Sequence, residues 1–109
     1  PTLEMADNAL SRYIAQKGKC AVTHNALSIT DMVCIHIKPC KGERNDTYRN
    51  LIILSKDVSK LVDATENKVI KKLLQNLTLT VEMQGKINKL RKYRELEEIQ
   101  FEDYIGTKM

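Results

Sequence analysis

Tryptophan is absent from this 109-residue chain, and its aromatic residues are limited to four tyrosines and one phenylalanine. A hydrophobic core must therefore be built from Leu, Ile and Val. No apolar run approaches the length of a membrane-spanning helix, and no signal-peptide pattern opens the sequence. We expect a protein that does not cross a membrane.

Glycine is also scarce, with four residues far apart at positions 18, 42, 85 and 106. This spacing excludes the glycine-rich loops that hold phosphate groups. No glycine-rich turn presents a nucleophile, and the carboxylates occur in charge runs rather than as pairs in apolar surroundings. We expect a protein without catalytic activity and without a cofactor.

The three cysteines, Cys20, Cys34 and Cys40, cannot all pair within one chain. An odd count suits a reducing compartment, so the sequence predicts an intracellular protein of the cytoplasm or nucleus. A secreted protein stays open as an alternative, because residues 45–47 and 76–78 match the acceptor pattern for N-linked glycans.

Cysteine and histidine also cluster, once at residues 20–24 and once at residues 34–40. Structural zinc sites use four such ligands, usually as pairs two to four residues apart on turns. On a strand, Cys34 and His36 would share a face, but Cys40 lies four residues further on, beyond a proline. No C-x-x-C motif is present, so we expect buried thiols, an exposed strand histidine and no metal.

The length predicts a single domain covering residues 1–109. A net charge of +4 and a pI near 9.0 favour contact with polyanions. Charge and composition together are those of an ordinary globular protein rather than a disordered chain.

Apolar and polar residues alternate from Leu27 to Lys38, with β-branched residues at the inward positions. This period predicts a half-buried strand, whereas apolar spacing of three to four predicts helices elsewhere. We therefore expect an α+β fold with a small antiparallel sheet. The predicted strands are about 19–24, 29–38 and 49–54, with a further candidate at 77–83, and the predicted helices are about 3–17, 56–75 and 86–104.

An all-α bundle is the competing interpretation. One unbroken helical stripe also fits Tyr48, Leu51, Leu54, Val58 and Leu61, and residues 66–104 could form one long C-terminal helix with a weak heptad pattern. Such a bundle would be an oligomerisation or adaptor module that binds a protein partner.

The connection between the predicted strands 29–38 and 49–54 is basic. Thr30, His36 and Lys38 would share one solvent face of the sheet. Cations with an occasional aromatic ring on an open sheet suit a single-stranded nucleic acid, because charges follow its backbone and rings stack on its bases. The candidate contacts are Lys19, Lys38, Lys41, Arg44, Tyr48 and Arg49.

The order of these elements resembles a known family. A short strand, the longer strand "MVCIHIKP", a basic loop, the strand "NLIIL" and the helix start "SKDVSKLVD" look like the positive-cofactor-four type of transcriptional coactivator. The resemblance covers roughly residues 17–75 and centres on the junction "LIILSKDVSKLV". It implies a dimer that grips single-stranded DNA and regulates transcription, with the helix 56–75 as a dimer element.

The predicted helix 86–104 is divided by charge. Residues 86–94 carry cations and no acid, whereas residues 95–103 carry acids and no cation. An antiparallel copy would place unlike halves together, which predicts a homodimer or docking on a protein partner; if the basic half instead faces a phosphate backbone, the acidic half would point away. The candidate dimerisation residues are Ile87, Leu90, Arg91, Arg94, Glu95 and Glu98.

The leading prediction is thus a non-enzymatic, homodimeric protein that binds single-stranded DNA or RNA through a basic sheet face and loop. The alternatives are an all-helical oligomerisation or adaptor module and, third, a secreted helical signalling protein.

Overall fold

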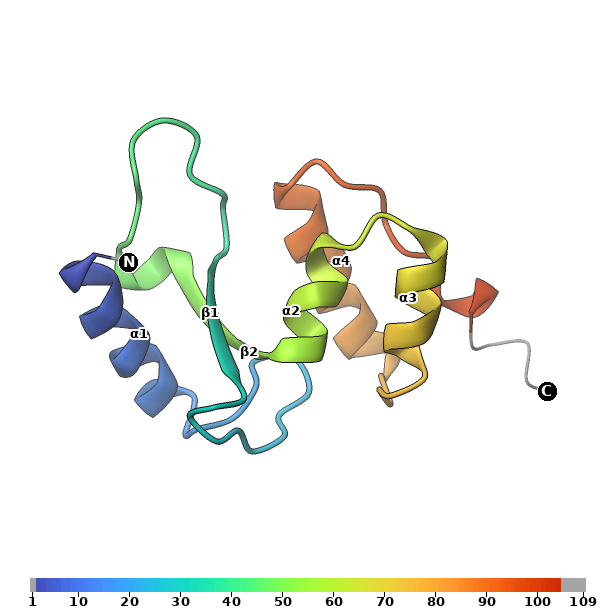
Figure 1. The fold of residues 1–109 in the computed structure, drawn as a ribbon, viewed down its shortest axis with the longest axis horizontal. Coiled ribbons are helices and arrows are strands. Elements are labelled where there is room, and N and C mark those ends of the chain that lie inside the picture. The colour runs from blue at the N-terminus through green and yellow to red at the C-terminus, as the bar shows by residue number, and fades with distance from the viewer. Residues whose placement is uncertain (1, 105–109) are drawn as a thin grey trace.

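The computed structural model describes residues 2–104. Figure 1 shows helix α1 and a two-stranded hairpin on one side of the molecule and helices α2, α3 and α4 on the other. The α+β prediction is confirmed, and the all-α alternative is wrong. The elements are α1 (Leu3–Ala15), β1 (Met32–His36), β2 (Leu51–Ser55), α2 (Lys56–Asp63), α3 (Asn67–Leu74) and α4 (Val81–Tyr93), with 3-10 turns at Tyr48–Asn50 and Phe101–Asp103.

The sheet consists of β1 and β2, paired antiparallel with Cys34 opposite Ile53. The outer edge of β2 is closed by Gln16, whose side chain both accepts from the backbone N–H of Ile53 and donates to its carbonyl. The predicted strand 49–54 is confirmed within two residues. The predicted strand 29–38 is too long, because the chain turns before β1: the N–H of Asp31 donates to the carbonyl of Ser28.

The predicted strand at 19–24 is wrong. This segment is a turn-rich loop with one isolated bridge between Lys19 and Ala26, and His24 has a φ of +65°. Cys20 and Val22 are fully buried, so the alternation of buried positions is present without a strand. A tight loop that inserts two apolar side chains into a core produces the same period-two pattern.

The predicted helix 56–75 is two helices. The buried guanidinium of Arg91, which belongs to α4, donates to the carbonyl groups of Leu61, Val62 and Ala64 at the end of α2. In a continuous helix those carbonyls would accept from N–H groups of the next turn. The side chain of Arg91 replaces these partners, so the chain can bend before α3 begins.

The strand considered at 77–83 is also wrong, since the chain becomes helical from Val81 onward. Thr80 is the N-cap of α4: its hydroxyl accepts a hydrogen bond from the N–H of Met83 at 3.2 Å. Glu82 in the first turn suits the positive end of the helix dipole.

The predicted helix 86–104 is wrong in both bounds, because α4 ends at Tyr93. Glu95 has a φ of +60°, and the N–H of Leu96 donates to the carbonyl of Arg91, which turns the chain back on itself. The acidic residues 95–103 therefore do not continue the basic helix, and the long coiled-coil helix of the sequence prediction is not formed.

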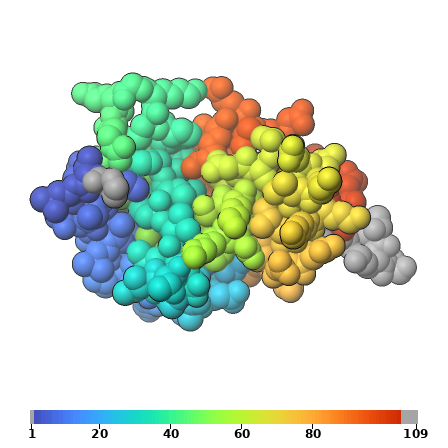
Figure 2. All heavy atoms as spheres, in the orientation of Figure 1, coloured from blue at the N-terminus to red at the C-terminus, as the bar shows by residue number. Residues whose placement is uncertain are grey.

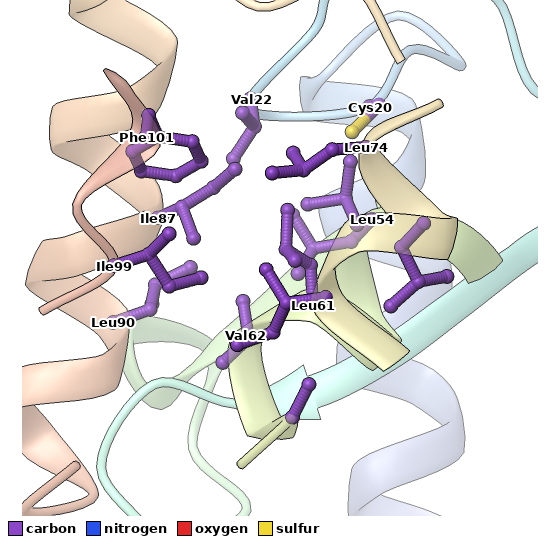
Figure 3. Close-up of a cluster of buried hydrophobic side chains, with 14 of the residues drawn as sticks. Cys20, Val22, Leu54, Leu61, Val62, Leu74, Ile87, Leu90, Ile99 and Phe101 are labelled. Carbon is purple, nitrogen blue, oxygen red and sulfur yellow. The ribbon is translucent and has the colours of Figure 1, made fainter. Parts of the chain in front are cut away.

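The returning segment packs against α4 from which it came. Asn88 exchanges two hydrogen bonds with the backbone of Ile99, at 2.8 and 3.2 Å. Ile99 and Phe101 then enter the core beside Ile87 and Leu90 (Figure 3). The burial of these two apolar side chains favours the reversal over a continued helix.

The core brings together side chains from both sides of the molecule. Figure 3 shows Cys20 and Val22 from the loop after α1 meeting Leu54 of β2 and Leu61 of α2. None of the helices in the described part of the chain has the length and apolar character that a membrane crossing requires.

Candidate nucleic-acid interface

A groove of about 430 Å³ lies between the hairpin and α4. Its floor is apolar, formed by Ala21, Val22, Ile37, Ile52 and Leu90. Val22 and Leu90 also belong to the hydrophobic core (Figure 3), so the floor of the groove is continuous with that core. We call this hollow the basic groove.

Four cations surround this floor: Lys38, Arg49, Lys86 and Lys89. Among the residues that line it within the described chain, none is Asp or Glu. The positive charges therefore lack the nearby carboxylates that usually neutralise surface lysines, and a hollow with low-dielectric walls strengthens their field.

The arrangement of these cations follows from local structure. Lys86 and Lys89 are three residues apart on α4, so they lie on the same helix face, and Tyr93 follows one turn later. Lys38 is held by Asn50, whose side chain accepts from the N–H of Lys38 and donates to its carbonyl.

Tyr93 adds an aromatic surface to the basic groove. The residue is 37% exposed, and the ammonium group of Lys38 lies 5.5 Å from the ring centroid. A partly exposed ring beside cations can stack on a planar base while the cations contact phosphates.

A second, shallower groove of about 770 Å³ lies along β1 and the loop 38–47, and its charges are mixed. Lys41 pairs with Glu95 at 3.3 Å, and Arg94 pairs with Asp63 at 2.9 Å. Figure 2 shows the loop at one rim of the molecule, next to the turn after α4. This groove is less suited to a polyanion, because its cations already have acidic partners.

Asp46 organises the loop side of this second groove. Its carboxylate is 3% exposed and accepts from Arg44, His36 and Thr2, with His36 Nε2 at 2.7 Å from Oδ1. Hydrogen bonds from Arg44, His36 and Thr2 hold the pKa of Asp46 well below its usual range. Asn8 of α1 donates to the Asp46 carbonyl, which ties the loop to α1.

The predicted nucleic-acid contacts are thus divided between different surfaces. Lys38 and Arg49 line the basic groove, whereas Lys41 and Arg44 lie on the second groove. Lys19 begins the turn-rich loop, and the ring of Tyr48 is covered by the Arg12 guanidinium at 4.2 Å.

The open basic sheet face expected from the alternation is not formed. Every residue of β1 is half-buried, and His36 is 20% exposed and hydrogen-bonded to Asp46. α1 packs against β2, and the loop after β1 brings Asp46 onto His36, so this position does not face open solvent.

The predicted dimerisation residues do not form one exposed helix face. Ile87, Leu90 and Arg91 are buried within the chain's own core. Burial lowers the pKa of Arg91, and its hydrogen-bond partners among residues 2–104 are all backbone carbonyls, that of Glu97 included. Arg94 is half-buried, while Glu95 and Glu98 are exposed beyond the end of α4. These residues do not form the exposed helix face that antiparallel pairing of two copies requires. Self-association stays a prediction.

Sequence reasoning missed Lys86, Lys89 and Tyr93 as groove residues. The signal was the acid-free stretch 86–94, in which these three share one helix face. The sequence predicts a helix dimer for this stretch, with contact to a phosphate backbone as the alternative. The sequence does not show that α4 packs alongside the hairpin, and this packing is what brings the three residues to the groove.

Comparison with known proteins returned no matching family model, no matching curated protein and no matching solved structure. The resemblance to the positive-cofactor-four type of coactivator stays a prediction.

Proposed function

We propose that this protein binds single-stranded nucleic acid in the basic groove. The observation that supports the proposal is the set Lys38, Arg49, Lys86 and Lys89 around an apolar floor, without a lining carboxylate in the described chain. Each cation that contacts a phosphate releases counterions from the nucleic acid, which favours binding.

The apolar floor and the ring of Tyr93 favour a single strand over a duplex. In a duplex the bases are stacked inside, so only phosphates and groove edges reach a protein surface. An unpaired strand can turn its bases toward Tyr93 and the floor while its phosphates face the lysines. The proposal does not depend on the predicted homodimer, because residues of one chain suffice to form the basic groove.

The proposal is tested by fluorescence anisotropy with a labelled single-stranded oligonucleotide across a range of salt concentrations. We expect the double variant Lys86→Glu/Lys89→Glu to bind at least tenfold more weakly. For the loss of two phosphate contacts with a single strand, the slope of log K against log salt should fall by about 1.4.

The matched control is Lys68→Glu/Lys71→Glu, which makes the same change of net charge on the exposed face of α3, outside the basic groove. We expect a much smaller loss for the control. Equal losses in both variants would reduce the interaction to general charge attraction, and no binding at low salt would contradict the proposal.

A further inference from the structure

The second groove holds a group of potential metal ligands that the sequence analysis did not assemble. His36, Cys40 and Asp46 each offer one ligand atom, and these atoms lie within 4.8 Å of one another. His36 ends β1, while Cys40 and Asp46 come from the loop that follows. The loop folds back so that two residues six positions apart face the same imidazole.

The three ligands are held by contacts outside the group. Asp46 is fixed through its carbonyl by Asn8 and through its carboxylate by Thr2. The thiol sulfur of Cys40 accepts from the backbone N–H of Asn45 at 3.2 Å, which orients the side chain. Side-chain burial differs across the group: Asp46 is 3% exposed and His36 20% exposed, so the cluster is shielded on one side and open on the other.

We propose that His36, Cys40 and Asp46 bind a divalent metal ion of the zinc type. Imidazole nitrogen, thiolate sulfur and carboxylate oxygen are the three ligand classes that zinc uses, and a mixed set with one sulfur disfavours the harder Mg²⁺ and Ca²⁺. Three protein ligands leave a fourth tetrahedral position. It faces the second groove, since His36 and Cys40 both line that groove.

A bound ion must displace the Arg44 guanidinium and the proton that His36 Nε2 donates to Asp46. The guanidinium bonds both carboxylate oxygens of Asp46, at 3.0 and 3.2 Å. The Arg44 side chain is 51% exposed, so it can swing toward solvent without disturbing the core. Arg44 and the metal therefore compete for Asp46, and removal of Arg44 should tighten metal binding.

The choice of ligands differs from the one that the sequence suggests. Spacing alone pairs Cys34 with His36, but the proposed set replaces Cys34 with Asp46, ten residues from His36. Cys20 is buried in the core and His24 lies exposed in a different loop. The inference is independent of the nucleic-acid proposal, because the basic groove shares none of these ligands.

The test is a titration of the reduced, chelator-treated full chain with cobalt(II) chloride, followed by absorbance. We expect one equivalent to produce thiolate-to-metal charge transfer in the near ultraviolet and the visible bands of four-coordinate cobalt, both abolished by added zinc(II). Cys40→Ser should lose the charge transfer, while Cys34→Ser and Cys20→Ser keep it. His36→Ala should weaken binding by about tenfold or more, and His24→Ala should not.

Circular dichroism of each variant checks that it is folded, and Cys40 is a mild site to change because its side chain is only half-buried. Absence of the charge-transfer band, or its survival in Cys40→Ser, would overturn the site. If Cys34→Ser loses the charge-transfer band to the same extent, the proposed ligand set is wrong. Arg44→Gln should tighten binding, and unchanged or weaker binding in that variant would remove Asp46 from the ligands.

Discussion

At the scale of single residues, polar side chains in this protein form hydrogen bonds with backbone groups. In other proteins such groups are usually bonded by a neighbouring strand or by the next turn of a helix. Gln16 bonds the edge of β2, Asn88 bonds the backbone of Ile99, and Arg91 bonds the end of α2. Each fixes a backbone segment far away in the sequence. Residue type alone does not predict these roles, because Gln, Asn and Arg are ordinarily exposed.

Arg91 gives the first prediction at this scale. Arg91→Ala leaves several buried carbonyls without a donor, and we expect a loss of about 3 kcal/mol or more in the free energy of unfolding. Urea unfolding measures this loss. Lys92→Ala, at the exposed neighbouring position, should change it by no more than about 0.5 kcal/mol; similar values for both variants would contradict the role of Arg91.

Tyr93 gives the second prediction at this scale. Tyr93→Ala should weaken oligonucleotide binding by about 1–3 kcal/mol, since one base loses its stacking partner. The salt slope should stay unchanged, because no phosphate contact is removed. Tyr48→Ala is the matched control, as its ring already stacks with Arg12. Equal effects of the two substitutions on anisotropy titrations would argue against stacking in the basic groove.

At the scale of elements, the start of α2 was predictable from its sequence, whereas the start of α4 was missed although both helices have the same kind of N-cap. Ser55 and Thr80 cap α2 and α4 by local chemistry, accepting from N–H groups three residues on. The end of α2 instead depends on Arg91, about thirty residues away. The reversal after α4 depends on the burial of Ile99 and Phe101 against residues that sequence pattern cannot place.

The segment 77–83 shows how two patterns compete. Leu77, Leu79 and Val81 alternate as a strand would, yet Thr80 is a helix cap. Thr80→Ala should lower the free energy of unfolding by about 1 kcal/mol, through loss of the hydrogen bond to the N–H of Met83. Thr78→Ala should have little effect, although in a strand both threonines would share one face. Thermal or urea unfolding of the two variants separates a cap from a strand.

At the scale of the whole molecule, the function depends on which surfaces the fold brings together. The fold class and the two strands were predictable, because the alternation of β1 and the apolar run of β2 are local. The basic groove was predictable only in part: Lys38 and Arg49 follow from the hairpin, whereas Lys86, Lys89 and Tyr93 reach it through the packing of α4. The cluster of His36, Cys40 and Asp46 likewise depends on a loop conformation that spacing does not reveal.

The predicted homodimer is a separate question, and light scattering of the full chain in solution checks it.

The most direct measurement of the central claim is an NMR titration of the isotope-labelled chain with a single-stranded oligonucleotide. We predict that backbone and side-chain signals of Lys38, Arg49, Lys86, Lys89 and Tyr93 shift together and saturate together, while those of Lys41 and Arg44 stay in place. Shifts confined to the loop around Lys41 and Arg44, or no shifts at low salt, would contradict binding in the basic groove.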